Sequence, residues 1–142
     1  MYCSGEQIVE RYGADVIAQL TSRGGSGDID QGVLDAAIAD ASAEIDMYLA
    51  GRYALPLSIV PMPLTRIACA LTRDILAVNS DVHDERWNRQ SDEARKMLHD
   101  IANGRISLGV SEKAQTPGAA AGNVQMESGG RVWDRNGSKG YI

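Results

Sequence analysis

The chain of 142 residues has room for one domain, and a domain of this size buries roughly two thirds of the surface that its unfolded chain exposes. The net charge of -5 argues against a sequence-independent hold on nucleic acid, which normally needs a basic face. No apolar run approaches the ~20 residues of a membrane span, and the first residues lack the basic and apolar regions of a signal peptide. We therefore expect a cytoplasmic protein that does not enter membranes.

The core is expected to be helical, and a first helix begins near the N-terminus. Phe is absent, so Leu, Ile, Val, Ala and Met must fill the core, and Ala-rich apolar positions favour closely packed helices. Ser4 and Gln7 have the spacing of a capping box, in which each side chain binds the backbone N–H of the other. Gly13 can divide this stretch into two short helices, and residues 22–27 form a Gly-rich loop.

The most regular periodic pattern predicts the longest helix of the fold over residues 31–52. Asp28 or Asp30 can cap its start. Apolar residues recur with the 3.6-residue period at Leu34, Ala37, Ile38, Ala41, Ile45 and Tyr48. At 1.5 Å per residue this helix is about 33 Å long, which is enough to form the spine of a small bundle.

Two further helices follow an extended crossover. Pro56, Pro61 and Pro63 prevent helix in the crossover, and Pro63 suits the first turn of the next helix. That helix presents one apolar face, formed by Leu64, Ile67, Ala68, Leu71, Ile75 and Val78. A fourth helix turns inward Trp87, Ala94, Met97, Leu98 and Ile101. Asn103 and Gly104 form its C-cap, and residues 105–108 can form a short strand.

These patterns predict a mainly α protein with two regions. Residues 1–109 form a small bundle of about four helices, and residues 110–142 form an extended C-terminal arm. Residues 111–122 are rich in Ala and Gly and contain few large apolar groups, so they cannot bury enough surface to order themselves. Beyond them, residues 124–126 and 131–133 flank a Gly-Gly pair and can form a β-hairpin, which is marginal in water without a surface to lie on.

The residues that usually carry chemistry do not form a recognisable site. His83 and His99 have no other His or Cys at metal-ligand spacing, and Cys3 and Cys69 are expected to be unpaired thiols. The chain has no GxSxG, P-loop, GxGxxG or HExxH motif. We therefore expect a protein without enzyme activity, metal or cofactor.

A helix-turn-helix DNA-binding module is an alternative that the composition leaves open. The fourth predicted helix carries six side chains that could contact DNA, namely Arg86, Asn88, Arg89, Gln90, Arg95 and Lys96. Acidic residues such as Asp92 and Glu93 are interspersed among them, which is more typical of a solvated, salt-bridged face.

The segment from the long helix to the crossover reads Ala37-Ile38-x-Asp40-Ala41-x-x-Glu44-Ile45-Asp46-x-Tyr48-Leu49, followed by Arg52-Tyr53-x-Leu55-Pro56-Leu57 and Val60-Pro61. This pattern resembles the Mu-like phage family of small neck proteins, which are head–tail connectors or adaptors. The pattern Leu98-x-x-Ile101-x-x-Gly104-x-x-x-Leu108-Gly109 and the tail motif Arg131-Val132-Trp133 match it as well. The fourth helix departs from it, because Trp87-Asn88-Arg89-Gln90 stands where a more tyrosine-rich motif is expected.

The resemblance implies a structural virion protein of the phage neck, present in the host cytoplasm during assembly. Its subunits would form a homo-oligomeric ring, usually twelvefold, between the portal protein and another neck or tail-completion protein. DNA would pass through the ring as cargo, and no cofactor is implied. The net charge of -5, repeated around a ring, predicts an acidic channel that does not hold DNA.

Two groups of residues are candidates for contacts within such a ring. In the arm, Arg131, Val132, Trp133 and Tyr141 are expected to bind a neighbouring subunit or the portal, with Trp133 as the anchor; the alternative is a dispensable, disordered terminus. Arg52 and Tyr53 can contact a neighbouring subunit. Alternatively, Arg52 caps its own helix and Tyr53 closes the end of its own bundle.

Overall fold

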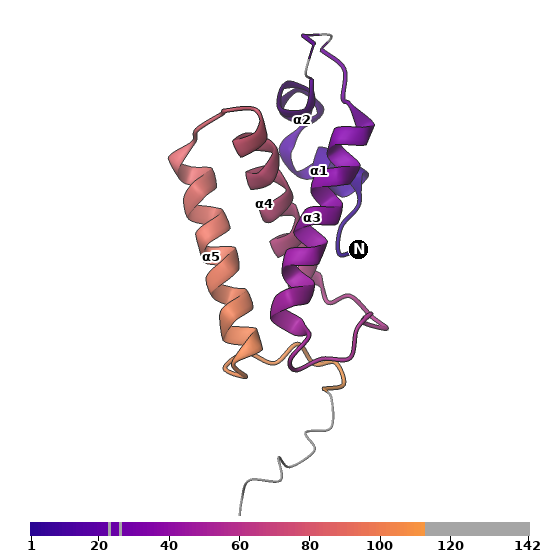
Figure 1. The fold of residues 1–142 in the computed structure, drawn as a ribbon, viewed down its shortest axis with the longest axis vertical. Coiled ribbons are helices and arrows are strands. Elements are labelled where there is room, and N and C mark those ends of the chain that lie inside the picture. The colour runs from indigo at the N-terminus through magenta and orange to yellow at the C-terminus, as the bar shows by residue number, and fades with distance from the viewer. Residues whose placement is uncertain (23, 26, 113–142) are drawn as a thin grey trace, which may run out of the picture.

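The computed structural model describes residues 1–22, 24–25 and 27–112, and this part of the chain contains helices but no β-strand (Figure 1). In chain order the helices are α1 (Gly5–Tyr12), α2 (Ala14–Thr21), α3 (Gln31–Leu49), α4 (Met62–Asn79) and α5 (Glu85–Ala102). The mainly α fold is therefore confirmed. There is one helix more than the expected four because Gly13 divides the first helical segment.

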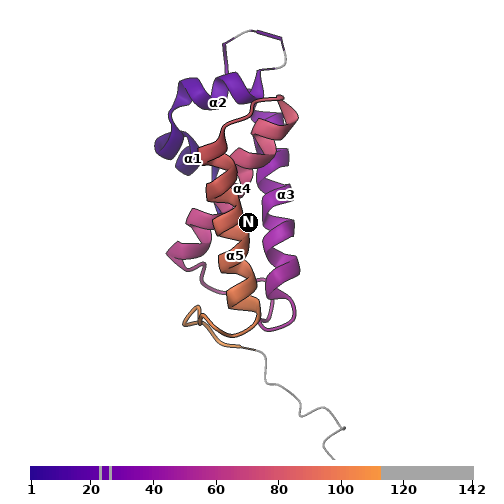
Figure 2. The same cartoon turned by 90° about the vertical axis from the view of Figure 1, so that its left-hand side faces the viewer.

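Helices α3, α4 and α5 run up and down beside one another, and the short helices α1 and α2 lie across one end of this bundle (Figures 1 and 2). Helix α4 packs against α3, α5 and both short helices. Its polar residues Thr72, Arg73 and Asp74 are consequently buried along with its apolar ones. None of the helices in the described ranges is long and apolar enough to cross a membrane.

Local backbone chemistry sets the break between α1 and α2. The Ser4 side chain accepts a hydrogen bond from the Gln7 N–H, and the Gln7 side chain accepts one from the Ser4 N–H, so the predicted capping box is confirmed. Gly13 has φ 90°, a conformation that residues with a side chain rarely adopt. Its N–H donates to the Val9 carbonyl at 2.8 Å, which closes α1 just before α2 begins.

Helix α3 begins as expected but ends at Leu49, before the predicted end at Arg52. Asp30 is its N-cap and accepts a hydrogen bond from the Val33 N–H at 3.1 Å. At the other end, the amides of Arg52 and Tyr53 both donate to the Leu49 carbonyl, at 3.0 and 2.8 Å. This turn carries the Tyr53 side chain into the core, where it is fully buried. The helix therefore ends three residues earlier than predicted, because the turn that follows it buries a large aromatic ring.

The described residues share one hydrophobic core at the junction of the helices. Its largest fully buried apolar side chains are Tyr53, Ile8, Ile17, Leu34, Ile45, Leu49, Leu64, Leu71, Leu76 and Leu98. Two expected core residues are exposed, Val78 at 66% and Met97 at 48%, whereas Tyr48, Ile75 and Trp87 are partly buried against the core. Val78 lies in the last turn of α4, and Met97 lies on the flank of α5 that faces away from α3.

The strand expected over residues 105–108 is not formed, and this prediction is wrong. Gly104 has φ 78°, and the amides of Arg105 and Ile106 turn back to the Asp100 carbonyl at 2.9 and 3.3 Å. The segment thus completes the C-terminal cap of α5, as the Asn103–Gly104 signal indicated. The nearest approach to a sheet is an isolated bridge between Tyr53 and Glu112. The predicted hairpin and most of the predicted arm lie in residues 113–142, outside the described ranges.

Candidate interaction surfaces

One arginine ties the three long helices together. Arg95 of α5 places Nε 2.8 Å from Glu44 Oε1 of α3, and Nη2 3.0 Å from Asp74 Oδ2 of α4. The two carboxylates raise the pKa of Arg95, with Glu44 as the main cause, so the guanidinium stays protonated between them. The positions of the helices relative to one another therefore depend on a polar contact as well as on the core.

A second arginine is buried at the junction of α1, α4 and α5. The Arg73 guanidinium lies between two aromatic rings, 4.4 Å from the centroid of Tyr12 and 4.9 Å from that of Trp87. Its Nη2 donates to Gln90 Oε1 at 2.7 Å, while its Nε has no hydrogen-bond partner in the described part of the chain. Burial lowers the pKa of Arg73. The two rings and the nearby carboxylates of Asp74 and Asp84 favour this buried cation, which sequence reasoning missed because Arg73 lies within an apolar helix.

The predicted contact residues Arg52 and Tyr53 both point into their own chain. Arg52 donates from Nη1 to the Ile101 carbonyl at 2.9 Å, and its Nη2 pairs with Glu112 Oε1 at 2.5 Å. A Cβ at Gly104 would lie 3.0 Å from Arg52 Nη1, so a glycine there allows the close approach. Tyr53 is fully buried, and its hydroxyl accepts a hydrogen bond from the Leu108 N–H at 3.3 Å. Tyr53 closes the end of its own bundle, as the intramolecular alternative describes, whereas Arg52 binds the last turn of α5 and Glu112 instead of capping its own helix. These contacts hold residues 105–112 against the end of the bundle.

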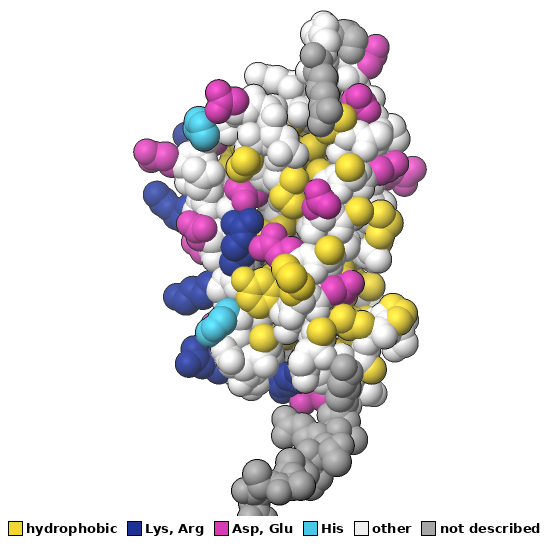
Figure 3. Space-filling model, in the orientation of Figure 1, with side chains coloured by type: hydrophobic (Ala, Val, Ile, Leu, Met, Phe, Trp, Pro, Cys, Tyr) yellow, Lys and Arg dark blue, Asp and Glu magenta, His cyan; other side chains and the backbone are white. Residues whose placement is uncertain are grey.

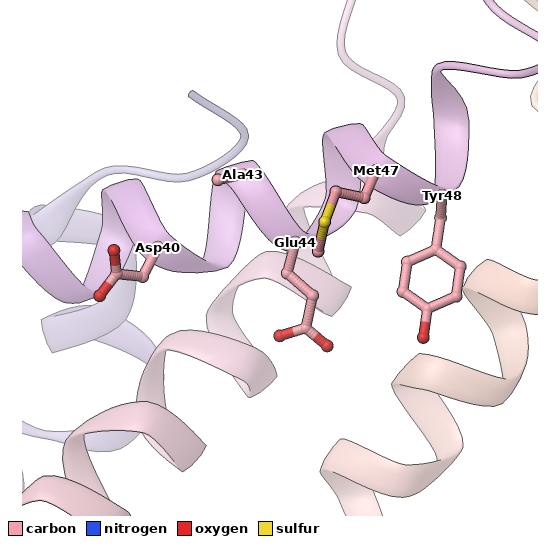
Figure 4. A pocket seen from close by; sticks show the side chains of 5 residues that line it. All are labelled: Asp40, Ala43, Glu44, Met47 and Tyr48. Carbon is pink, nitrogen blue, oxygen red and sulfur yellow. The ribbon is translucent and has the colours of Figure 1, made fainter.

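The exposed side of α3 is acidic, and a shallow hollow lies where it borders α5, because Glu44 in the lining pairs with Arg95 of α5 (Figure 4). The hollow has a volume of about 470 Å³ and is lined by Asp40, Ala43, Glu44, Met47 and Tyr48. Glu44 and Tyr48 point from α3 to the same side, whereas Met47 is 74% exposed. Helix α3 has four acidic residues and no Lys or Arg. In the space-filling view, Lys and Arg side chains accordingly gather on the α5 side and not over α3 (Figure 3).

A larger groove runs between α4 and α5 and has a volume of about 890 Å³. Its apolar lining includes Ile67 and Ala70 of α4 and Ala94 of α5, and the exposed methionines Met62 and Met97 also border it. Three cations, Arg11, Arg66 and Lys96, line it together with the acidic residues Glu93 and Asp100. Sequence reasoning missed this groove, because it assigned Met97 to the core.

The residues considered for metal or redox chemistry are the histidines and the two cysteines. In the described ranges, no three His, Cys, Asp or Glu side chains are grouped to hold a metal. His83 is an exposed residue whose Nε2 lies 3.3 Å from Asp81 Oδ1. Cys3 and Cys69 are buried free thiols, and their mutual hydrogen bond, together with burial, raises the pKa of Cys3. The arm residues Arg131, Val132, Trp133 and Tyr141 lie outside the described residues.

Comparison with known proteins shows that this helical chain is a phage protein. The family model described as Bacteriophage Mu, Gp36 matches residues 2–127. The chain is 37% identical over 142 residues to the "Mu-like prophage FluMu protein gp36" of Haemophilus influenzae, covering all of this chain and 99% of that protein. It is 30% identical over 142 residues to "Gene product J" of Escherichia phage Mu, with 99% of each chain covered. The chain belongs to the Bacteriophage Mu Gp36 family, which confirms the resemblance to a Mu-like phage family.

Proposed function

We propose that the protein is a structural component of the virion neck and one subunit of a head–tail connector ring, without enzyme activity or cofactor. The observation that carries this proposal is the match to a phage family over residues 2–127, together with end-to-end similarity to two Mu-related proteins. The ring would join the portal protein to another neck or tail-completion protein and let DNA pass. A ring of identical subunits needs two different surfaces on each subunit, and we take the α3 face and the α4–α5 groove as the candidates.

The C-terminal arm is proposed to be the part that binds the portal or a neighbouring subunit. The bridge and the ion pair at Glu112, the last residue described, hold it at the end of the bundle opposite α2 (Figure 1). Trp133 would be the anchor, with Arg131, Val132 and Tyr141 around it, because Trp, Tyr and Arg are the residues that most often dominate interfaces. Strand addition suits a Gly-rich segment, since main-chain hydrogen bonds then supply much of the affinity.

The structure weakens the alternative of a helix-turn-helix DNA-binding module. Of the six side chains that supported it, Gln90 is bonded to Arg73, and Arg95 is bonded to Glu44 and Asp74. These two side chains hold the bundle together instead of projecting toward a ligand. A gel-shift experiment at low salt with duplex DNA tests the alternative, and we expect no shifted band.

A complementation experiment tests the connector proposal. A phage that lacks this gene is supplied with the intact chain, with a chain that ends at Glu112, or with Trp133→Ala, and particles are examined by electron microscopy. We expect joined particles only with the intact chain, and separate heads and tails with the other two. Ser138→Ala is the matched control in the arm. Far-UV circular dichroism should show the same helical content for all variants.

The outcomes separate the two parts of the proposal. Joined particles in the absence of the gene would overturn the connector function. Joined particles with the truncated chain would overturn only the role of the arm. An acidic channel remains part of the proposal, and mapped channel residues that are mainly Lys and Arg would contradict it.

A further inference from the structure

The groove between α4 and α5 is an open surface with an apolar centre and a basic rim. Met62 is 80% exposed and Met97 is 48% exposed, so two large flexible apolar side chains border the groove in contact with solvent. Exposed apolar surface bordered by polar residues is typical of a protein interaction site, and methionine adapts its shape to a partner. Such a groove suits the side of a helix.

The charges on the groove favour an acidic partner. Arg66 and Lys96 are exposed and have no hydrogen-bond or ion-pair partner in the part of the chain that the structure describes, and Arg11 adds a third cation. Of the two acidic lining residues, Asp100 already pairs with Arg105 at 3.1 Å. Glu93 is then the one carboxylate that opposes the three cations. The occupant should therefore combine carboxylates with apolar side chains and carry few cations of its own.

The exposed side of α3 has these properties. Asp40, Ala43 and Met47 share one outward face, because they are three, four and seven residues apart. Asp40 has no hydrogen-bond or ion-pair partner within the described ranges, and a hollow opens beside it. Small side chains such as Ala36 and Ala43 let another helix approach to a distance of roughly 8–10 Å. Helix α3 contains no Lys or Arg, so it presents no positive charge that would be repelled by the basic rim of the groove.

The two surfaces lie on different sides of the subunit. Arg95 marks the flank of α5 that faces α3, because it pairs with Glu44. Gln90, Glu93 and Met97 line the groove, and at 100° per residue they lie on the opposite flank of α5. The groove therefore opens away from α3. Two complementary surfaces on different sides give a head-to-tail contact, which repeats from copy to copy and forms a ring when the rotation between copies closes.

We infer that the groove between α4 and α5 of one copy receives the outer face of α3 of the next copy. Met62 and Met97 pack against Ala43 and Met47 of that copy, and the rim cations face its Asp40. This assignment rests on the proposed ring and specifies its subunit contact. The charge of residues 113–142 argues against the arm as occupant, since they carry four Lys or Arg and two Asp or Glu and would bring positive charge to a basic rim.

Cysteine cross-linking tests the contact in the full chain. The double variant Ala43→Cys/Met97→Cys is expressed in phage-producing cells, mild oxidation is applied, and multimers are resolved on a non-reducing gel. We expect a ladder of dimers, trimers and larger species, both in the lysate and in purified virions. The matched control Ala43→Cys/Asp92→Cys places the second cysteine on an exposed position of α5 outside the groove, and it should give no ladder.

Charge reversal provides a second measurement on the same cross-link. Asp40→Lys in the Ala43→Cys/Met97→Cys background should reduce the ladder several-fold at low salt, because it places a cation against the rim. Asp92→Lys, an equal change of charge outside the groove, should leave the ladder intact. Equal effects of the two reversals would overturn the assignment.

Each remaining outcome is decisive. Absence of the ladder from both lysate and virions overturns the inference, and the presence of the protein in those virions would leave the connector proposal standing. A ladder in the lysate with no protein in virions supports the contact and overturns the virion role. Dimers from Ala43→Cys alone would show that α3 packs on α3. Cross-linking of Met97→Cys to Trp133→Cys, without a link to Ala43→Cys, would assign the groove to the arm.

Discussion

The guanidinium of Arg73 is stacked against the ring of Tyr12, with 4.4 Å between its central carbon and the ring centroid. Trp87 covers the same guanidinium at 4.9 Å, so a buried cation joins α1, α4 and α5. Lysine cannot stack in this way, because its charge sits on a compact ammonium group. We predict that Arg73→Lys lowers the free energy of unfolding by about 1–3 kcal/mol, measured by urea denaturation. Arg73→Met should cost less, since an apolar chain of similar length does not bury a charge. Arg89→Lys, at an exposed position, is the control, and an equal loss there would contradict the argument.

The contact of Arg95 with Glu44 and Asp74 leads to a second prediction. Arg95→Ala leaves the Asp74 carboxylate, whose side chain is 12% exposed, without its cation. We expect a loss of about 1–3 kcal/mol in the free energy of unfolding, because hydrogen bonds to charged groups contribute more than neutral ones. Arg86→Ala on the same helix is exposed and should change stability by less than about 0.5 kcal/mol. Similar unfolding curves for the two variants would contradict the prediction.

The environment of Tyr2 predicts a decrease in stability at alkaline pH. Burial raises the pKa of Tyr2 above its ordinary value of 10.0, and the hydrogen bond from its hydroxyl to Asp46 adds to the shift. The folded state therefore keeps this proton at a pH where the unfolded chain loses it. The contribution is complete below about pH 10 and is lost as pH rises above that value toward the folded pKa. Unfolding free energies measured from about pH 8 to pH 11 should show the decrease, and Tyr2→Phe should make it shallower. An unchanged slope in Tyr2→Phe would refute the assignment to Tyr2.

Arg52 is predicted to control local order at the start of the C-terminal arm. Arg52→Ala removes the donor to the Ile101 carbonyl and the ion pair with Glu112. Hydrogen exchange of the amides in residues 105–112 should become faster, while exchange in the centres of α3 and α4 should change little. Arg105→Ala removes an ion pair whose arginine side chain is 72% exposed, and it serves as the control. Equal acceleration by the two variants would show that Arg52 does not hold the segment.

The features that the sequence predicted correctly are set by neighbouring residues. The capping box of Ser4 and Gln7, the break at Gly13 and the cap at Asn103 and Gly104 each depend on interactions within a few residues. The same holds for the periodic pattern that predicts α3. Local geometry and side-chain spacing determine these features, so they can be predicted without knowledge of the rest of the fold.

The features that the sequence missed depend on which segments meet in the fold. Residues 105–108 have the composition of a strand, but no second strand pairs with them in the part of the chain that the structure describes, and the amides of Arg105 and Ile106 complete the cap of α5 instead. Met97 satisfies the apolar period of α5, yet the packing of α3 against the other flank leaves it at a groove.

The sequence alone determined that this protein is a helical bundle, where most of its helices begin and end, and which phage family it resembles. Only the tertiary structure decided that Glu44, Asp74 and Arg95 meet, that Arg73 lies between two rings, and that an acidic face and a basic groove lie on different sides. The physical reason is that helix formation requires hydrogen bonds between residues four apart, whereas the surface depends on how whole helices pack.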